Sequence, residues 1–377
     1  MPESNLKRRL RVGIIFGGRS GEHEVSLVSA TAVMSALDSE KYDVVPIGIT
    51  PEGRWISSPR ALGMLKEKAP LDREPERFLI PEPNRQGLIA AGGDGGTPVP
   101  LDVVIPLVHG TYGEDGTLQG LLELANIPYV GAGVLASAVG MDKIVQKMVF
   151  AEAGLPVVRY CWCHSAECRE NPTKVMRMVE RELRYPVFVK PANTGSSVGI
   201  SKVHARGELA PALAHAAEFD RKVIIEQGIR NAREIECSVL GNDAPEASMP
   251  GEIIPSNEFY DYDAKYVDGK STAVVPARLR APVVRKIREI AVRAYSAIDC
   301  AGMARVDFFV TKGKVYLNEI NTIPGFTAIS MYPKMWEAAG LSFSGLLDRL
   351  IRLAIQRHGE MNARRTSYSP AKDWYRS

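Results

Sequence analysis

The sequence predicts a mixed fold that begins with an open α/β domain and continues with helices interspersed among antiparallel strands. Over residues 11–50, an apolar run ends in Gly-Gly and is followed by a polar turn, a segment with helical apolar spacing and a second apolar run. This β-loop-α-β order is typical of an open α/β domain. Farther along, REIECSVLGN at 233–242 alternates apolar and polar residues, which indicates a half-buried antiparallel strand.

In the first domain, apolar runs separated by turn residues mark the successive elements. We predict strand, helix, strand, strand and helix at 11–17, 24–37, 41–50, 101–110 and from Thr117 onward. Residues 58–100 are rich in Pro, Gly and charged residues, so they are predicted to form loops with short strands. We place the end of this α/β domain near Ala138, which gives a domain over 1–138.

The rest of the chain continues with helices and strands. Helices are predicted from Met141 to Gly154 and over 281–298 and 342–360, because their apolar residues follow helical spacing. Strands are predicted at 185–190, 221–229, 304–310 and 314–320. The last segment, 361–377, is polar and has little to bury.

Composition excludes several classes of protein. The chain has 377 residues and a formal net charge of only +3, which gives no reason to expect a nucleic-acid partner. Its apolar runs are far shorter than the roughly 20 residues that span a bilayer, so we expect no membrane insertion. The first apolar run is also too short for a secretion signal, and we interpret it as a strand after a short tail.

The cysteines indicate a reducing compartment. Five cysteines in a long chain without a secretion signal favour free thiols and a cytoplasmic location. Cys161, Cys163, His164 and Cys168 have the residue types of a zinc site, but Cys-x-Cys is not the common spacing and no second ligand pair follows. The alternative is a strand whose alternate cysteines face one side. We expect no metal here.

The loop KPANTGSSVG, Lys190–Gly199, has the composition of a phosphate-binding loop. A lysine ends an apolar strand, and small residues follow whose backbone N–H groups can face one anion. The loop is not a Walker A motif, because GxxxxGK[ST] is missing from the sequence. Nor is GGRSGE at 17–22 a dinucleotide fingerprint, because it lacks GxGxxG and no dinucleotide-binding context follows. A plain hairpin turn is the alternative interpretation.

A second motif, ARVDFFV followed by KVYLNEINTIPG, has the composition of a metal site. Asp307 lies in one strand, and Glu319 and Asn321 share one face of the next. These hard oxygen ligands suit Mg²⁺ completed by phosphate oxygens. Buried acids are costly unless they are paired or metal-bound. An ion pair with Arg305 is the alternative, although it leaves Asn321 unexplained.

Together the two motifs resemble an ATP-grasp ligase, in which two α+β subdomains hold ATP between their sheets. Six motifs narrow the resemblance to the D-alanine–D-alanine ligase family: GGRSGEHEVS, HGTYGEDGTLQG, GMDK, KPANTGSSVG, EFYDYDAKY and NEINTIPGFTAIS. It covers about residues 11–350. The resemblance implies that the α/β domain over 1–138 carries the first D-alanine subsite. It also implies a central ATP-grasp subdomain over 139–222, and a C-terminal one over 223–360 with the metal site and a lid.

The resemblance implies an ATP site formed by Lys143, Lys190, Ser197, Glu226, Glu234 and Lys265. Lys143 and Lys190 would contact the α- and β-phosphates as point charges. Glu226 would begin the segment that holds the adenine, and Glu234 would accept hydrogen bonds from the ribose. This segment, EQGIRNARE, is longer and more basic than is usual in the family. Asp307, Glu319 and Asn321 would bind two Mg²⁺ ions, for which Mn²⁺ can substitute.

The implied catalytic and substrate-binding residues are Glu22, His109, Ser196, Lys265, Tyr266, Arg305, Gly325, Ser330 and Met331. Glu22 would pair with the ammonium of the first D-alanine, beside His109, and would form a hydrogen-bonded triad with Ser196 and Tyr266. Lys265 would reach the transferred phosphoryl group or the substrate carboxylate.

In the same resemblance, Arg305 and the N–H of Gly325 would stabilise the tetrahedral oxyanion. Ser330 would hold the carboxylate of the second D-alanine, with Met331 beside it. The segment 258–270, with three tyrosines, fits a lid over the site.

The implied reaction is ATP-dependent formation of D-alanyl-D-alanine through a D-alanyl phosphate, for peptidoglycan precursor synthesis, by a protein that tends to form homodimers. One alternative is a D-alanine–D-lactate ligase, which the family pattern distinguishes at Tyr266, where tyrosine favours the dipeptide. A second alternative is a non-catalytic ATP-binding regulator, which would need neither a complete metal set nor Arg305.

Overall fold

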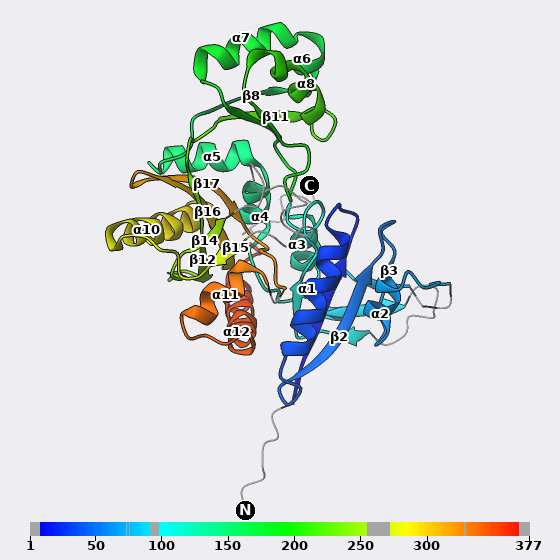
Figure 1. The fold of residues 1–377 in the computed structure, drawn as a ribbon. Helices are drawn as coiled ribbons and strands as arrows, with labels where there is room; N and C mark the ends of the chain where they lie inside the picture. Colours follow the sequence, from blue (N-terminus) through cyan, green and yellow to red (C-terminus); the bar gives the residue numbers. More distant parts are fainter. Residues whose placement is uncertain are drawn as a thin grey trace, which may run out of the picture.

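The fold consists of three lobes, each of which contains at least one β-sheet (Figure 1). The computed structural model describes residues 8–72, 74, 76–90, 98–254, 272–327 and 329–368. Sheets and helices alternate throughout, so the predicted mixed α/β character is confirmed. Within the described ranges, no helix combines the length and apolar character needed to cross a membrane.

The N-terminal lobe contains a sheet in the order β3-β2-β1-β7. β1 (Leu10–Gly17) runs parallel to β2 (Tyr42–Ile49) and β7 (Val103–Pro106), and β3 (Trp55–Ile56) is the antiparallel edge. Central parallel strands are covered on both faces, which explains the continuous apolar run in β1. α1 (His23–Ala36) packs against β1, so the turn between them, which includes Glu22, lies at the carboxyl end of the sheet.

The predicted loop-rich region of this lobe forms a small antiparallel sheet, β4-β5-β6. The remaining elements of the lobe are α2 (Ala61–Lys66), β4 (Arg77–Leu79), a 3₁₀ turn (Pro83–Arg85), β5 (Gly87–Ala90), β6 (Val99–Pro100) and α3 (Thr117–Leu124).

The central lobe contains an antiparallel sheet in the order β10-β9-β11-β8. Its elements are β8 (Tyr160–His164), α6 (Ser165–Glu170), α7 (Pro172–Glu182), β9 (Val187–Pro191), β10 (Ser201–Val203), α8 (Arg206–Ala216) and β11 (Lys222–Gln227). The helices that precede it in the chain, α4 (Val134–Met141) and α5 (Lys143–Glu152), pack against the strand at Lys314–Asn321 of the C-terminal lobe. The proposed boundary between 222 and 223 falls inside β11, whose pairing with β8 and β9 puts it in the central sheet.

The C-terminal lobe contains an antiparallel sheet in the order β15-β14-β12-β16-β17, with β13 paired to β12. Its elements are β12 (Arg233–Gly241), β13 (Glu246–Ala247), β14 (Gly251–Ile254), β15 (Thr272–Val274), α10 (Ala281–Ala297), β16 (Gly302–Thr311), β17 (Lys314–Asn321), α11 (Met331–Ala338) and α12 (Phe343–Asn362). Leu346 and Leu350 of α12 share a core with Val12 and Ile14 of β1. The first and third lobes therefore share one hydrophobic core.

The two lobes also meet at a close backbone contact. Gly302, at the start of β16, has φ +71°, and a Cβ built there would lie 2.9 Å from the backbone nitrogen of Gly131. Backbone atoms cannot move aside as a flexible side chain can. Glycine is therefore required at 302 both for its φ angle and for the space.

Gly302→Ala should lower the free energy of unfolding by roughly 1–3 kcal/mol, because strain in φ adds to a backbone clash. Gly340→Ala is the matched control, since Gly340 also has a positive φ (+88°) but has nothing within 4 Å of the added Cβ. Urea denaturation of both variants measures the difference. Equal losses would show that the contact with Gly131 contributes nothing.

Candidate active site

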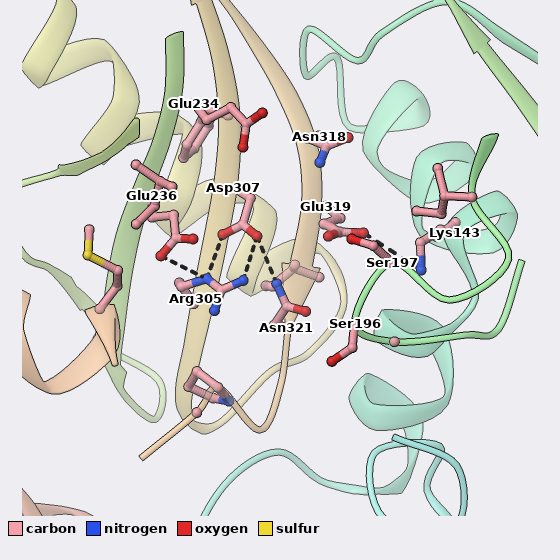
Figure 2. A pocket seen from close by; sticks show the side chains of 18 of the residues that line it. Lys143, Ser196, Ser197, Glu234, Glu236, Arg305, Asp307, Asn318, Glu319 and Asn321 are labelled. Carbon is pink, nitrogen blue, oxygen red and sulfur yellow. Dashed lines mark hydrogen bonds and ion pairs between the residues drawn. The ribbon is translucent and has the colours of Figure 1, made fainter. Parts of the chain in front are cut away.

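A cavity of about 1470 Å³ opens where the three lobes meet, and its wall takes residues from each of them. Figure 2 shows this cavity, with acidic side chains on β16 and β17 near Lys143 and the serines of the loop after β9. The predicted site residues that line it are Glu22, His109, Lys143, Lys190, Ser196, Ser197, Glu226, Glu234, Arg305, Asp307, Glu319, Asn321, Gly325, Ser330 and Met331. Lys265 and Tyr266 lie outside the described residues.

The loop after β9 connects the central lobe to Glu22 of the N-terminal lobe. Ser196 and Ser197 both have left-handed backbone conformations, with φ +47° and +62°. The Ser196 hydroxyl donates a hydrogen bond to Glu22 Oε1. A Cβ at Gly195 or Gly110 would lie 2.5 or 2.7 Å from Glu22 Oε2, so both glycines make room for this carboxylate. Part of the predicted triad, the Glu22–Ser196 bond, is therefore present.

Lys143 connects the same loop to the metal-site strand. It begins α5, whose N-cap Asp142 accepts hydrogen bonds from the N–H groups of Ile144 and Val145. Its Nζ donates to the carbonyl of Thr194 at 2.7 Å and lies 3.7 Å from Glu319 Oε2. The ammonium is thus held between the loop and β17, where it can meet an anion bound in the cavity.

Glu226 is paired with two lysines, one of which was not predicted as a site residue. Lys190 Nζ lies 2.6 Å from Glu226 Oε2, and Lys147 Nζ lies 3.0 Å from Oε1. Burial alone would raise the pKa of the Glu226 carboxyl, but the two ammonium groups lower it to about 2. Lys147 is one helical turn beyond Lys143, so the spacing K-x-x-x-K was the sequence signal that could have identified it.

The acids of β16 and β17 lie opposite one another. Asp307 pairs with Glu319, and Arg305 pairs with Asn321, both before the β-bulge that follows Asp307. Arg305 donates two hydrogen bonds of 2.7 Å to the Asp307 carboxylate, and Asn321 Nδ2 donates a third at 3.0 Å. The register brings the predicted metal ligands together. The ion pair that was offered as the alternative is also formed.

Arg305 makes a second ion pair, with Glu236 at 3.2 Å. Burial alone would lower the pKa of the guanidinium, but the carboxylates of Asp307 and Glu236 raise it well above its ordinary value. Glu236 lies opposite Asp307 on β12 and was not predicted as a site residue. Glu236 lies two residues after Glu234 on the same strand, so both side chains face the cavity. This spacing was the sequence signal that could have identified Glu236.

His109 is buried beside Glu114, a second acid that was not predicted. Its Nε2 lies 3.1 Å from the Ser29 hydroxyl, and its Nδ1 lies 3.3 Å from the Ile323 carbonyl and 3.4 Å from Glu114 Oε1. Burial would lower the pKa of His109, but Glu114 outweighs this and raises it. The imidazole is therefore fixed in position before any substrate arrives.

The turn before α11 presents Ser330 to the cavity. Its hydroxyl oxygen accepts a hydrogen bond from the N–H of Thr327 at 3.0 Å and lies 2.8 Å from the Thr327 hydroxyl. A Cβ at Gly325 would lie 2.9 Å from Ser330 Oγ, so glycine leaves space there. Met331 follows as the first residue of α11 and is buried.

The cysteine cluster lies away from the cavity. Cys163 Sγ and Cys168 Sγ are 3.2 Å apart, both residues are buried, and all the cysteines are free thiols. In the described part of the chain, no three side chains drawn from His, Cys, Asp and Glu are grouped so that they could hold a metal ion. The metal set predicted on β16 and β17 consists of two acids and an amide.

A cavity that brings lysines together with acids on strands has the charges of a class of proteins that bind an anionic substrate, such as a nucleotide, between lobes. Family comparisons agree, since "D-ala D-ala ligase N-terminus" matches residues 11–132 and "D-ala D-ala ligase C-terminus" matches residues 149–352. The chain belongs to the D-alanine–D-alanine ligase family.

Individual relatives match almost the full length of the chain. The D-alanine–D-alanine ligase of Thermoanaerobacter sp. (strain X514) is 51% identical over 355 residues, covering 93% of this chain and 98% of that protein. That of Geobacillus kaustophilus (strain HTA426) is 49% identical over 354 residues, with coverages of 93% and 96%.

Two solved structures are similar in fold. The D-alanine–D-alanine ligase from Coxiella burnetii has a TM-score of 0.81 and 40% identity, and the match covers 94% of this chain and 96% of that one. The VanG D-Ala:D-Ser ligase from Enterococcus faecalis has a TM-score of 0.82 and 39% identity, with coverages of 92% and 100%.

Glu226→Gln should remove a pH-dependent part of the stability. The carboxyl pKa is lowered from 4.5 to about 2 in the folded protein, so the ionised group stabilises the fold above about pH 4.5, and this contribution is lost as the pH falls toward 2. From about pH 5 to pH 3, the unfolding free energy of the parent should fall by roughly 2 kcal/mol more than that of the variant. Urea denaturation at several pH values measures this, and parallel pH profiles would contradict the pairing.

Proposed function

We propose that this chain joins two D-alanine molecules at the expense of ATP, through a D-alanyl phosphate, and so supplies a peptidoglycan precursor. The observation that carries the proposal is the match to both ligase family descriptions, with about half of the residues identical to D-alanine–D-alanine ligases over 93% of the chain. The cavity supports it, because the motif residues from all three lobes meet there.

In the proposed site, the lysines bind the nucleotide. Lys143 and Lys190 contact the α- and β-phosphates, and each is already held by a neighbouring acceptor, Thr194 or Glu226. Fixed cations lose little freedom when the phosphates arrive. Ser197 adds a polar contact from the loop, and Glu234 accepts hydrogen bonds from the ribose.

Asp307, Glu319 and Asn321 would hold two Mg²⁺ ions, or Mn²⁺ in their place. Their oxygens are of the type that Mg²⁺ prefers, and the β16–β17 register sets Glu319 opposite Asp307. A carboxylate accepts about four hydrogen bonds or ligands, so Asp307 can keep Arg305 and still bind a cation. When bound, the metal would neutralise charge on the phosphates.

The first D-alanine would lie between Glu22 and His109, with its ammonium on Glu22. Its carboxylate oxygen attacks the γ-phosphorus, and the bond from phosphorus to the bridging oxygen of ADP breaks. In the next step the neutral amine of the second D-alanine attacks the acyl carbon and loses a proton. The bond from the acyl carbon to the bridging oxygen breaks, and this oxygen leaves as part of the phosphate. Catalysis consists mainly of positioning and charge neutralisation.

Arg305, Gly325, Ser330 and Met331 would serve the second step. Arg305 and the N–H of Gly325 face the developing oxyanion, and Ser330 binds the second carboxylate beside Met331. The bidentate bond to Asp307 keeps the Arg305 guanidinium in one orientation. Lys265 and Tyr266 are proposed to complete the site from a lid, because water hydrolyses acyl phosphates.

We further propose that the central and C-terminal lobes form an ATP-grasp pair, supported by the two antiparallel sheets that flank the cavity. We propose domain limits of 1–138, 139–227, 228–360 and 361–377, with the second limit moved from 222 to the end of β11, which pairs within the central sheet. We also propose that the protein is a cytoplasmic homodimer. The free thiols support the cytoplasmic location.

Phosphate release from ATP with a panel of amino and hydroxy acids tests the proposed function. D-alanine should stimulate release and give D-alanyl-D-alanine in equal amount, whereas L-alanine should not. Because one structural relative is a D-Ala:D-Ser ligase, D-serine and D-lactate belong in the panel as second substrates. If D-alanyl-D-lactate or D-alanyl-D-serine forms in preference to the dipeptide, the protein is one of the alternative ligases. Nucleotide binding without turnover would indicate a regulator.

Glu319→Gln should give a folded protein that loses most of its Mg²⁺-dependent turnover, because the amide keeps the size of the side chain but removes its charge. Glu289→Gln is the control, since this acid on α10 is exposed and does not line the cavity. Turnover across a Mg²⁺ titration provides the measurement. Parent-like activity of Glu319→Gln at ordinary Mg²⁺ would refute the ligand assignment.

A further inference from the structure

Lys147 is a buried lysine for which neither the sequence motifs nor the proposed mechanism gives a role. It lies on α5, and only 1% of its surface is exposed. Taking an ammonium out of water costs several kcal/mol unless it is paired and hydrogen-bonded. A lysine in such a position therefore requires specific partners.

Those partners come from two different sheets. Lys147 Nζ donates to the backbone carbonyl of Asn318 at 2.7 Å and lies 3.0 Å from Glu226 Oε1. Asn318 is the additional residue in the bulge of β17, next to Glu319, whereas Glu226 lies on β11 of the central sheet. The single ammonium thus joins α5 to both strands at the back of the cavity.

Glu226 extends this chain of contacts to the cavity itself. Its second oxygen accepts a hydrogen bond from Lys190 Nζ at 2.6 Å. Glu226, Lys190 and Asn318 all line the cavity, while Lys147 lies behind them. Burial lowers the pKa of Lys147, and the Glu226 carboxylate opposes this effect. The order of contacts is Asn318, Lys147, Glu226 and Lys190.

We propose that Lys147 is a positioning residue for nucleotide binding. By fixing Glu226, Lys147 holds the Lys190 ammonium where the phosphates bind. By binding the Asn318 carbonyl, it also sets the distance from the Lys190 ammonium to Glu319. Lys147 itself does not touch the substrate. This inference rests on the proposed function, since it assigns Lys147 a part in the same ATP site.

A purely structural role would have a different consequence. If Lys147 only filled space and paired a charge, its loss would lower stability but leave the ATP affinity of the folded protein unchanged. If it positions Lys190, the affinity must fall in protein that is fully folded. Direct binding of a non-hydrolysable ATP analogue separates the two roles, and the KM values for ATP and D-alanine give a second readout.

Lys147→Met keeps the length of the side chain and removes the charge. We expect the Kd for the analogue to rise roughly tenfold to a hundredfold, the size expected when a buried charged hydrogen bond is lost. The KM for ATP should rise in parallel, while the KM for D-alanine stays at the parent value. Lys174→Met is the matched control, because the Lys174 side chain on α7 is 77% exposed and forms a surface ion pair with Glu167.

A second variant covers the case in which Lys147→Met does not fold. Lys147→Met combined with Glu226→Gln removes both members of the Lys147–Glu226 pair, and the cation that loses its partner, Lys190, lines the cavity, where water can reach it. We expect this protein to fold and still bind the analogue weakly, because Lys190 then loses the carboxylate that holds it. Parent-like affinity in either folded variant would overturn the positioning role.

The parent protein distinguishes this inference from the proposed function. If the parent forms no dipeptide from ATP and D-alanine, the proposed function fails, and the role of Lys147 in it fails too. If the parent forms the dipeptide and Lys147→Met binds the analogue as the parent does, only the role of Lys147 fails. Weak binding by the variants beside an active parent supports both.

Discussion

Charge pairing in and behind the cavity wall is the constraint on which this structure depends. The buried ammonium groups of Lys147 and Lys190 share the Glu226 carboxylate, and Arg305 is held between Asp307 and Glu236. Each ion would be costly to bury alone. The strands that carry these ions can therefore pack only in the register that brings the partners together. Local pairing of this kind keeps cations and acids in place without a bound substrate.

The β-sheets position the charged side chains closely enough for these ion pairs to form. The β16–β17 register sets Asp307 against Glu319, and the bulge after Asp307 turns the Asn318 carbonyl toward Lys147. The shared core of α12 and β1, together with the contact at Gly302, holds the first lobe against the third. Because these contacts are backbone and core contacts, the cavity walls are set by the fold.

The sequence predicted most strands and helices correctly, since apolar runs such as 11–17 and 304–310 correspond to β1 and β16. It also predicted which residues gather at the cavity, because their motifs are local. Lys147, Glu114 and Glu236 were missed, since their importance comes from partners distant in the chain, such as Glu226 for Lys147. The membership of β11 in the central sheet likewise depends on pairing with β8 and β9, which residue spacing does not encode.

The bond between Ser196 and Glu22 joins residues 174 positions apart in the chain. Gly110 and Gly195 leave space for the same carboxylate, so neither loop can gain a side chain without displacing Glu22. The N-terminal lobe and the loop after β9 are thus not independent modules. In a chimera made by exchanging lobes between two relatives, these loops would have to be transferred together, and over evolutionary time substitutions in one would be accepted only with matching changes in the other.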